Sequence, residues 1–261
     1  MDLDLDGKIA VVTGGSRGIG LAVTRSLLAE GATVVVGARE ASPELAEFES
    51  TGRVVFVPVD LLEPGSPAAL VDRAAGLGGV DVLVNNAGAV TPRPGGFLDV
   101  TDADWDRTLA LTLMVPVRVT RAALPQLMRR NGGSIVTVSS VNAFLPDPLV
   151  VDYSAAKGAL TNFCKSLSKE VGRQGIRVNT VSPGPVSTEL WLGSGGVAST
   201  VAAANDVDAD DVAAQAAASA VTGRFTRPDE VAALVTVLAG DRLGNVTGAD
   251  FVIDGGLVTT L

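Results

Sequence analysis

Residues 13–20 read TGGSRGIG, and this stretch decides the fold. It follows the apolar run 9–13 and opens a helical apolar pattern over residues 19–30. Glycines between a strand and a helix let the backbone approach a pyrophosphate, whose charge the helix N-terminus stabilises. The spacing is Gly-x-x-x-Gly-x-Gly, and no Gly-Lys-Ser/Thr follows as it would in a P-loop. Alone, the stretch would also fit an ordinary tight turn. At the head of a helix it favours a dinucleotide site.

Short β-branched runs alternate with longer helical patterns along the whole chain. This alternation predicts one α/β domain over residues 1–261, a doubly wound, Rossmann-type parallel sheet of about seven strands with helices on both faces. The expected strands are 9–13, 33–37, 54–57, 82–85, 134–139, 177–181 and 251–253. The expected helices lie near 19–30, 66–76, 102–130, 152–172 and 229–239. Near-continuous apolar runs are typical of strands that helices cover on both faces.

Residues 188–227 differ from the rest of the chain. They are rich in Gly and Ser, then in Ala, and they carry Asp206, Asp208, Asp210 and Asp211. Such a segment fits a solvated connector or a mobile lid over a pocket. We favour a substrate lid, because of where the segment falls relative to the motifs described below.

Composition excludes several classes of function. Hydrophobic residues make up 47% of the chain and charged residues 19%, so it can bury a large core. The formal net charge of −9 opposes binding to nucleic acid. No uninterrupted apolar stretch approaches the roughly 20 residues that span a bilayer, so no membrane partner is expected. The start, MDLDLD, lacks the basic and apolar regions of a signal peptide, and we expect a cytoplasmic protein.

The chain contains no histidine and one cysteine, Cys164, which we expect to be a buried packing residue. A Cys-rich zinc site, most other metal sites, and catalysis by Ser-His-Asp or Cys-His are therefore excluded. An acid or base that works near neutral pH must be a carboxylate, a lysine or a tyrosine. The chain has a single tyrosine, Tyr153.

Further motifs give the chain a family resemblance. Residues 85–88 read NNAG after the expected fourth strand, residues 153–157 read YSAAK, and residues 179–184 read NTVSPG, with Thr188 four residues on. Together with the glycine spacing, they make the chain resemble the short-chain dehydrogenase/reductase family over nearly its whole length. The resemblance implies a nicotinamide cofactor held by Gly14, Ser16, Arg17, Gly18, Ile19, Gly20, Arg39, Asp60, Leu61, Asn86, Ala87, Gly88, Tyr153, Lys157, Pro183, Gly184, Val186 and Thr188.

The end of the second strand favours NADP(H) over NAD(H). Ala38 stands where NAD-selective relatives carry an aspartate, and Arg39 follows it. With Arg17 in the glycine turn, two guanidinium groups suit a 2′-phosphate through charge-assisted bonds. The alternative is that both are ordinary surface arginines and that Glu40 supplies the acid of an NAD site.

Tyr153 and Lys157 are spaced i, i+4 and share one helix face. A free phenol has a pKa of about 10, which a nearby ammonium and an oxidised nicotinamide would lower. Tyr153 could then give a proton to a developing alkoxide or take one from an alcohol. The alternative is a packing tyrosine beside a surface lysine. By resemblance, Lys157 also holds the nicotinamide ribose.

Ser140 and Thr112 complete the expected catalytic set. Ser140 lies 13 residues before Tyr153, where the family's catalytic serine ends the fifth strand; its neighbour Ser139 is a rival that alternation turns to the other face. Thr112 stands where the family carries an asparagine that holds a water of the proton relay to lysine. Its hydroxyl could hold that water, but threonine is shorter, so the relay is in doubt.

The sequence thus predicts an NADPH-dependent ketoreductase that acts on a carbonyl or secondary alcohol of a hydrophobic small molecule. The alternative is a non-catalytic NADP(H)-binding sensor or scaffold, motivated by Thr112. The expected substrate wall consists of Val141, Asn142, Phe144, Leu149, Trp191 and Leu192. Helices 102–130 and 152–172 are more apolar than one sheet face requires, and relatives pair them across subunits, so we expect a homotetramer or a dimer.

Overall fold

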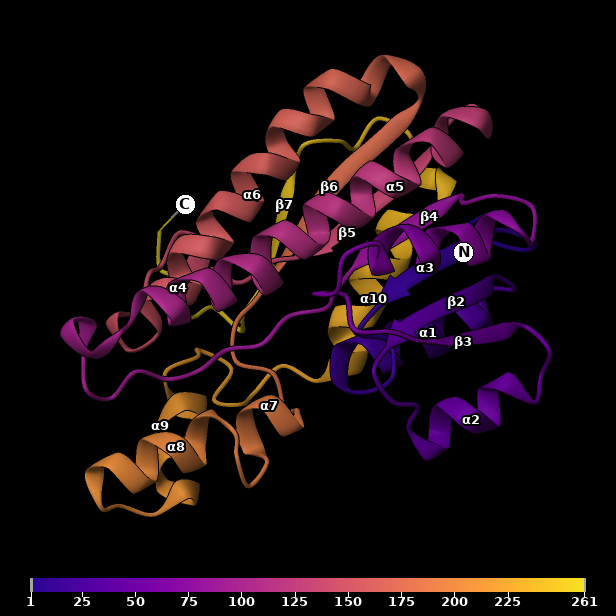
Figure 1. The fold of residues 1–261 in the computed structure, drawn as a ribbon. Coiled ribbons are helices and arrows are strands. Elements are labelled where there is room, and N and C mark those ends of the chain that lie inside the picture. The colour runs from indigo at the N-terminus through magenta and orange to yellow at the C-terminus, as the bar shows by residue number, and fades with distance from the viewer. Residues whose placement is uncertain (1, 261) are drawn as a thin grey trace.

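A computed structural model describes residues 2–260 and contains one seven-stranded parallel sheet (Figure 1). The strand order is β3-β2-β1-β4-β5-β6-β7, so the order reverses between β1 and β4. In open α/β sheets ligands bind beside such a reversal, at the carboxyl ends of the strands. The Rossmann-type prediction is confirmed. The strands are β1 (Ile9–Thr13), β2 (Thr33–Ala38), β3 (Val54–Pro58), β4 (Val82–Asn85), β5 (Gly133–Val138), β6 (Ile176–Pro183) and β7 (Asp250–Ile253).

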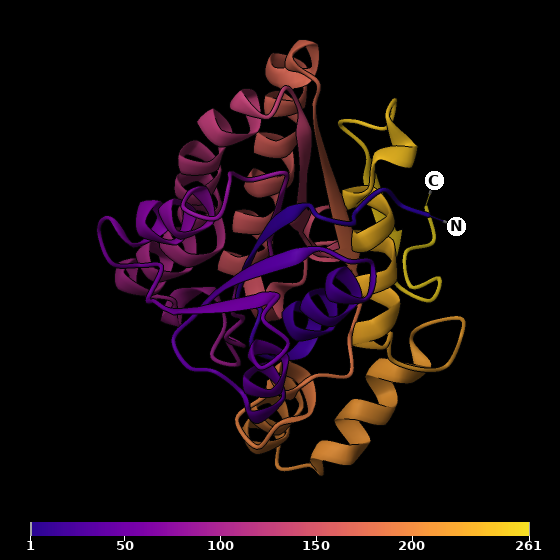
Figure 2. The ribbon, with the colours of Figure 1, turned by 90° about the vertical axis from the view of Figure 1, so that its right-hand side faces the viewer.

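Helices cover both faces of the sheet, as Figure 2 shows from the side. One face is covered by α1 (Gly18–Ala29), α2 (Pro43–Glu49) and α10 (Pro228–Ala239). The other is covered by α3 (Ser66–Ala75), α5 (Val115–Arg129) and α6 (Val151–Val171). The remaining helices are α4 (Asp102–Leu109), α7 (Glu189–Leu192), α8 (Val197–Asn205) and α9 (Ala209–Ala218). No helix within residues 2–260 is both long and apolar enough to cross a membrane.

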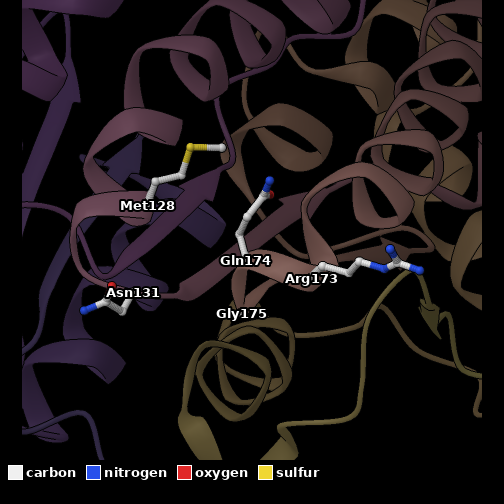
Figure 3. A pocket seen from close by; sticks show the side chains of 5 residues that line it. All are labelled: Met128, Asn131, Arg173, Gln174 and Gly175. Atoms are coloured by element: carbon white, nitrogen blue, oxygen red, sulfur yellow. The ribbon is translucent and has the colours of Figure 1, made fainter.

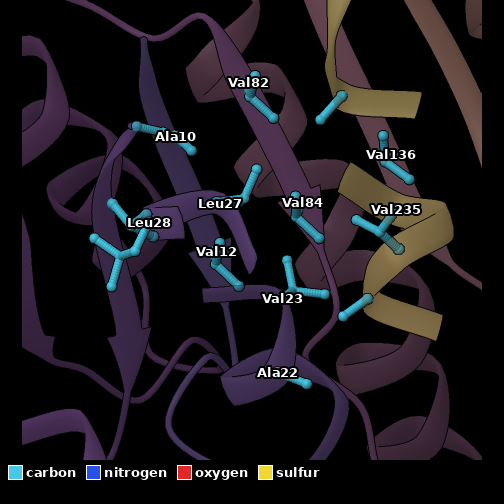
Figure 4. Close-up of a cluster of buried hydrophobic side chains, with 14 of the residues drawn as sticks. Ala10, Val12, Ala22, Val23, Leu27, Leu28, Val82, Val84, Val136 and Val235 are labelled. Atoms are coloured by element: carbon cyan, nitrogen blue, oxygen red, sulfur yellow. The ribbon is translucent and has the colours of Figure 1, made fainter. Parts of the chain in front are cut away.

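Strand alternation divides the core between the two faces. Ala10 and Val12 of β1 face α1 and α10, whereas Ile9 and Val11 belong to the cluster with α3, α5 and α6. Figure 4 shows the first cluster, in which Val235 of α10 lies close to the strands. Both faces of the central strands are therefore dry, and the sheet is a rigid base for groups at its edge.

Three sequence expectations need correction. The helix expected at 102–130 is interrupted by a π-helical segment, Ala110–Met114, between α4 and α5. Helix α2 was not expected, because its 7 residues bury only Leu45 and show little periodicity. The edge strands β3 and β7 are partly exposed, since each has one neighbouring strand and incomplete helix cover.

Residues 188–227 form helices α7, α8 and α9 below the carboxyl edge of the sheet in Figure 1. The two ends of the segment are joined. The Ser187 N–H donates to Thr226 O at 2.9 Å, and the Thr226 N–H donates to Pro185 O at 3.0 Å. The segment is thus a helical insertion whose two ends are held together by backbone hydrogen bonds. That it moves as a lid stays a prediction.

Candidate active site

The glycine turn is packed so closely that side chains are excluded from it. Gly14 has φ +65° and Gly18 has φ +55°, where glycine is favoured. A Cβ on Gly14 would lie 3.0 Å from the Ala87 Cα, and a Cβ on Gly20 would collide with Gly14 O and the Asn86 amide. The turn and the segment after β4 therefore fit together only because these positions are glycine.

Asn86 and Thr13 hold that fit in place. The Asn86 amide donates to Thr13 O at 3.0 Å and to Gly14 O at 3.1 Å. The Thr13 hydroxyl accepts the Asn86 and Ala87 N–H groups at 2.9 and 3.0 Å. These hydrogen bonds hold the turn after β1 and the segment after β4 in a fixed arrangement at the switch point, at the carboxyl edge of the sheet.

This edge fits a bound pyrophosphate. Helix α1 begins at Gly18 with no side-chain cap and no acid in its first turn, so its first N–H groups are free for an anion. Thr188 also lies at this turn, because its side chain is 3.4 Å from the position of a Cβ on Gly18. Arg17, Arg39 and Asp60 are exposed at the ends of β1, β2 and β3, and Leu61 is buried. Among the described residues, neither arginine forms a salt bridge.

Ser140 and Ser139 point to different partners, as alternation predicts. β5 ends at Val138, so Ser140 is not the end of the strand but the N-cap of the short 3-10 turn Val141–Ala143. Its hydroxyl donates to the Asn142 Oδ1 at 3.0 Å and accepts the Asn142 N–H at 3.2 Å. The Ser139 hydroxyl instead hydrogen-bonds with Thr161 of α6 at 2.7 Å.

Tyr153 and Lys157 lie side by side on α6. The Lys157 Nζ is 5.5 Å from the centroid of the Tyr153 ring and donates to the Val138 carbonyl at 2.8 Å. Lys157 is only 4% exposed, so it is not a surface lysine. The last carbonyl of β5 therefore fixes the ammonium against the phenol ring.

Burial dominates the protonation of this pair in the protein by itself. Burial raises the pKa of Tyr153 to about 12, and hydrogen bonding with Ser140 acts in the opposite direction. Burial also lowers the pKa of Lys157 to about 8. The predicted lowering of the phenol pKa requires both Lys157 and an oxidised nicotinamide and stays a prediction; in the protein by itself, desolvation dominates. At neutral pH, the phenol is a proton donor.

Comparison with known proteins agrees with this architecture. The sequence profile described as short chain dehydrogenase matches residues 8–195. The chain belongs to the short-chain dehydrogenase family. It is 37% identical to cis-4-hydroxycyclohexanecarboxylate dehydrogenase of Sinomonas cyclohexanicum, over 95% of this chain and 96% of that protein. It is 36% identical to oxidoreductase UcpA of Escherichia coli K12, over 97% and 95%.

A solved structure extends the likeness to three dimensions. L-Sorbose reductase from Gluconobacter frateurii, complexed with NADPH and L-sorbose, matches this short-chain dehydrogenase with a TM-score of 0.91 and 34% identity. The match covers 100% of both chains. The whole of this chain therefore has the fold of a dehydrogenase that acts on alcohol and carbonyl groups.

Thr112 is the position at which the family resemblance predicts an asparagine. Its hydroxyl is buried, lies in the π-helical segment, and has no hydrogen-bond partner within the described part of the protein. A buried hydroxyl without a partner costs free energy. A π-helical segment is a frequent mark of a functional position, but the sequence contains no signal that distinguishes it from regular helix.

The residues expected at the substrate wall lie on three separate segments of the chain. Val141, Asn142 and Phe144 follow Ser140, Leu149 precedes α6, and Trp191 and Leu192 belong to α7. Trp191 makes an edge-to-face contact with Phe225, with ring centroids 5.4 Å apart. The role of these residues in binding stays a prediction.

A separate hollow of about 490 Å³ lies away from this site (Figure 3). It is lined by Met128, Asn131, Arg173, Gln174 and Gly175, which precede β5 and β6. It therefore opens at the amino-terminal edge of the sheet, opposite the glycine turn and Tyr153. Because it contains none of the predicted site residues, we assign it no part in the reaction.

Sequence reasoning missed a cluster of charges that lies beside the catalytic helix. Arg93, in the segment after β4, donates to Asp152 at 2.7 Å and to Asp104 at 2.9 Å. Asp152 directly precedes Tyr153. No motif marks these residues, because 59 positions separate Arg93 from Asp152.

Proposed function

We propose that the protein is an NADPH-dependent ketoreductase that transfers hydride between the cofactor and a carbonyl or secondary alcohol of a hydrophobic small molecule. One observation carries the proposal. The Lys157 ammonium is fixed by the Val138 carbonyl against the ring of Tyr153, whose phenol interacts with Ser140. Family membership supports the reaction class, since short-chain dehydrogenases interconvert alcohols and carbonyls.

Ser140, Tyr153 and Lys157 each have a separate role in carbonyl reduction. The nicotinamide, when bound, supplies the hydride. Ser140 orients and polarises the carbonyl oxygen through its hydroxyl. Tyr153, protonated at neutral pH, donates its proton to that oxygen as negative charge develops. Lys157 then stabilises the phenolate, because an opposite charge close to the ring favours the ionised form.

Arg17 and Arg39 support NADP(H) rather than NAD(H). Both side chains are exposed at the carboxyl edge, and neither has an acidic partner among the described residues. β2 ends at Ala38, so no acid stands there to accept bonds from a free ribose hydroxyl. The NADPH in the L-sorbose reductase structure is consistent with this choice. Glu40 remains the alternative partner for an NAD ribose.

Cofactor choice is tested by kinetics with both nucleotides. We expect kcat/KM with NADPH to exceed that with NADH by more than tenfold, about 1.4 kcal/mol of discrimination. The double substitution Ala38→Asp with Arg39→Leu should erode or reverse the preference. Equal use of both cofactors by the unaltered protein would contradict the assignment.

A hydrophobic ketone is the substrate class that we propose. Phe144 and Leu192, which are 44% and 49% exposed, and the partly buried Leu149 and Trp191 offer apolar surface, whereas Val141 is buried. Asn142 is the one amide in the set, and its side chain is engaged by Ser140. Apolar pockets with few polar groups typically bind small organic molecules.

The decisive experiment is a panel of ketones and secondary alcohols, followed by the absorbance of NADPH. We expect reduction of at least one hydrophobic ketone. If NADPH binds but no carbonyl is reduced and no alcohol is oxidised, the ketoreductase proposal fails. The non-catalytic sensor or scaffold, which Thr112 motivates, would then be favoured.

A further inference from the structure

Four side chains form a partly buried polar cluster beside Tyr153, here called the Arg93 cluster: Arg93, Asp104, Thr108 and Asp152. The Arg93 Nη2 donates to the Asp152 Oδ2 at 2.7 Å, and its Nη1 donates to the Asp104 Oδ1 at 2.9 Å. The Thr108 hydroxyl donates to the same Asp152 oxygen at 2.7 Å. The Asp152 side chain is 2% exposed and that of Arg93 is 15% exposed. The guanidinium therefore bridges one buried carboxylate, Asp152, and one partly exposed carboxylate, Asp104, whose side chain is 33% exposed.

The partners of Arg93 come from the elements that carry the site. Arg93 follows the Asn86–Gly88 stretch by five residues, and its backbone N–H donates to the Leu149 carbonyl at 2.7 Å. Asp104 forms a capping box at the start of α4, which leads into the π-helical segment with Thr112. Asp152 lies in the first turn of α6. Arg93 thus joins the segment after β4 to the start of α4 and to the first turn of α6.

Stability alone does not explain such a cluster. Removing two charges from water costs so much that a buried ion pair often gains little over apolar residues of the same shape. The Arg93 Nε and the Asp152 Oδ1 are both buried without a hydrogen-bond partner in the described chain, which adds to that cost. A planar guanidinium held by two carboxylates does, however, fix distances and angles between the elements that supply them.

Asp152 retains its charge in this setting. Burial would raise its pKa, but hydrogen bonds from Arg93 and Thr108, the charge of Arg93 and the backbone N–H of Tyr153 together hold the pKa below its usual value. The carboxylate thus remains a permanent anchor for the guanidinium at neutral pH.

We propose that Arg93 is a positioning residue for the catalytic helix: through Asp152 and the Leu149 carbonyl, it holds Tyr153 in register with the segment after β4 and with Thr112. Arg93 does not touch the reacting atoms. The kinetic consequence rests on the proposed ketoreductase function, whereas the structural consequence does not.

The chain offers a matched control for the test. Arg130 binds the Asp81 carboxylate through Nε at 2.8 Å and Nη2 at 3.1 Å, and the Asp81 side chain is 7% exposed. This pair lies at the start of β4, at the edge of the sheet opposite Tyr153. Arg93→Met and Arg130→Met each leave one buried aspartate without its arginine. Both should therefore lower Tm, but only Arg93→Met should alter the site.

Kinetics and hydrogen exchange separate positioning from stability. We expect Arg93→Met to lower kcat by about 10²-fold, the cost of a displacement of roughly 1 Å, and Arg130→Met to leave kcat unchanged. Peptides over residues 89–100 and 145–153 should exchange faster in Arg93→Met than in Arg130→Met. Arg93→Lys keeps the charge but loses the planar fork, so it should recover Tm without recovering kcat.

Each outcome decides the proposal. If Arg93→Met loses stability but keeps kcat, or if Arg93→Lys matches the wild type in kcat, Arg93 is structural and the proposal is wrong. If the wild type reduces no carbonyl, the ketoreductase function fails, and the exchange comparison decides instead. Unchanged exchange over both peptides would then overturn the role of Arg93. Should Arg93→Met not fold, Arg93→Lys supplies the same comparisons.

Discussion

Replacing Tyr153 with phenylalanine removes one hydroxyl and leaves its surroundings intact. The Lys157 Nζ donates to the Val138 carbonyl at 2.8 Å, a bond that does not involve the phenol. Phenylalanine also keeps the aromatic ring, whose centroid lies 5.5 Å from the Lys157 Nζ. The substitution removes the hydrogen bond between the phenol and Ser140, which is worth about 0.5–1.5 kcal/mol. The variant should therefore fold and bind cofactor.

The catalytic loss should be much larger than the loss of stability. With a pKa of about 12, the phenol is fully protonated at neutral pH and is the acid of the proposed reduction. General acid catalysis contributes about 10²–10⁴-fold, or about 2.7–5.4 kcal/mol at 1.36 kcal/mol per decade. No histidine exists in the chain to replace it. We expect kcat to fall by that factor while the Kd for NADPH changes little.

The assay combines ketone turnover, thermal unfolding and NADPH binding by fluorescence. Ser140→Ala should also lower kcat, whereas Ser139→Ala is its control, because Ser139 is bonded to Thr161 instead. A Tyr153→Phe protein that keeps full turnover would refute the proton-transfer role. A protein that loses cofactor binding and activity together would show that the phenol supports the site rather than the chemistry.

Three further predictions concern pH, the relay and assembly. The reduction rate should fall as pH rises through about 8, because Lys157 then loses the charge that stabilises the phenolate; a rate that stays level to about pH 10 would contradict this. Thr112→Asn should leave kcat within about tenfold or raise it, if the threonine hydroxyl already holds the relay water imperfectly; a complete loss of turnover would show that threonine is required. Light scattering should show a homotetramer or a dimer, and a 26.4 kDa monomer at micromolar concentration would exclude both.

Local signals made most of the fold predictable. Each central strand is a short β-branched run. The glycines in residues 14–20 stand where a side chain would be strained or would collide with a neighbour, as a Cβ on Gly14 would with Ala87. Tyr153 and Lys157 are four residues apart, and helical geometry alone then predicts that their side chains lie on the same face of the helix. The interruption at Ala110–Met114 was not predictable, because a single π-helical turn leaves the apolar pattern of α4 and α5 nearly unchanged.

The electrostatic state of the site depends on packing that no local pattern contains. Spacing places Lys157 beside Tyr153, but it does not show that burial raises the pKa of Tyr153 to about 12 and lowers that of Lys157 to about 8 in the protein by itself. Arg93 and Asp152 meet only because β4 and α6 place their ends at the same edge of the sheet. Motif spacing therefore identifies which groups react, whereas their protonation and alignment are properties of the folded edge. For this reason, variants of Arg93 test the alignment of the site, whereas variants of Tyr153 test its chemistry.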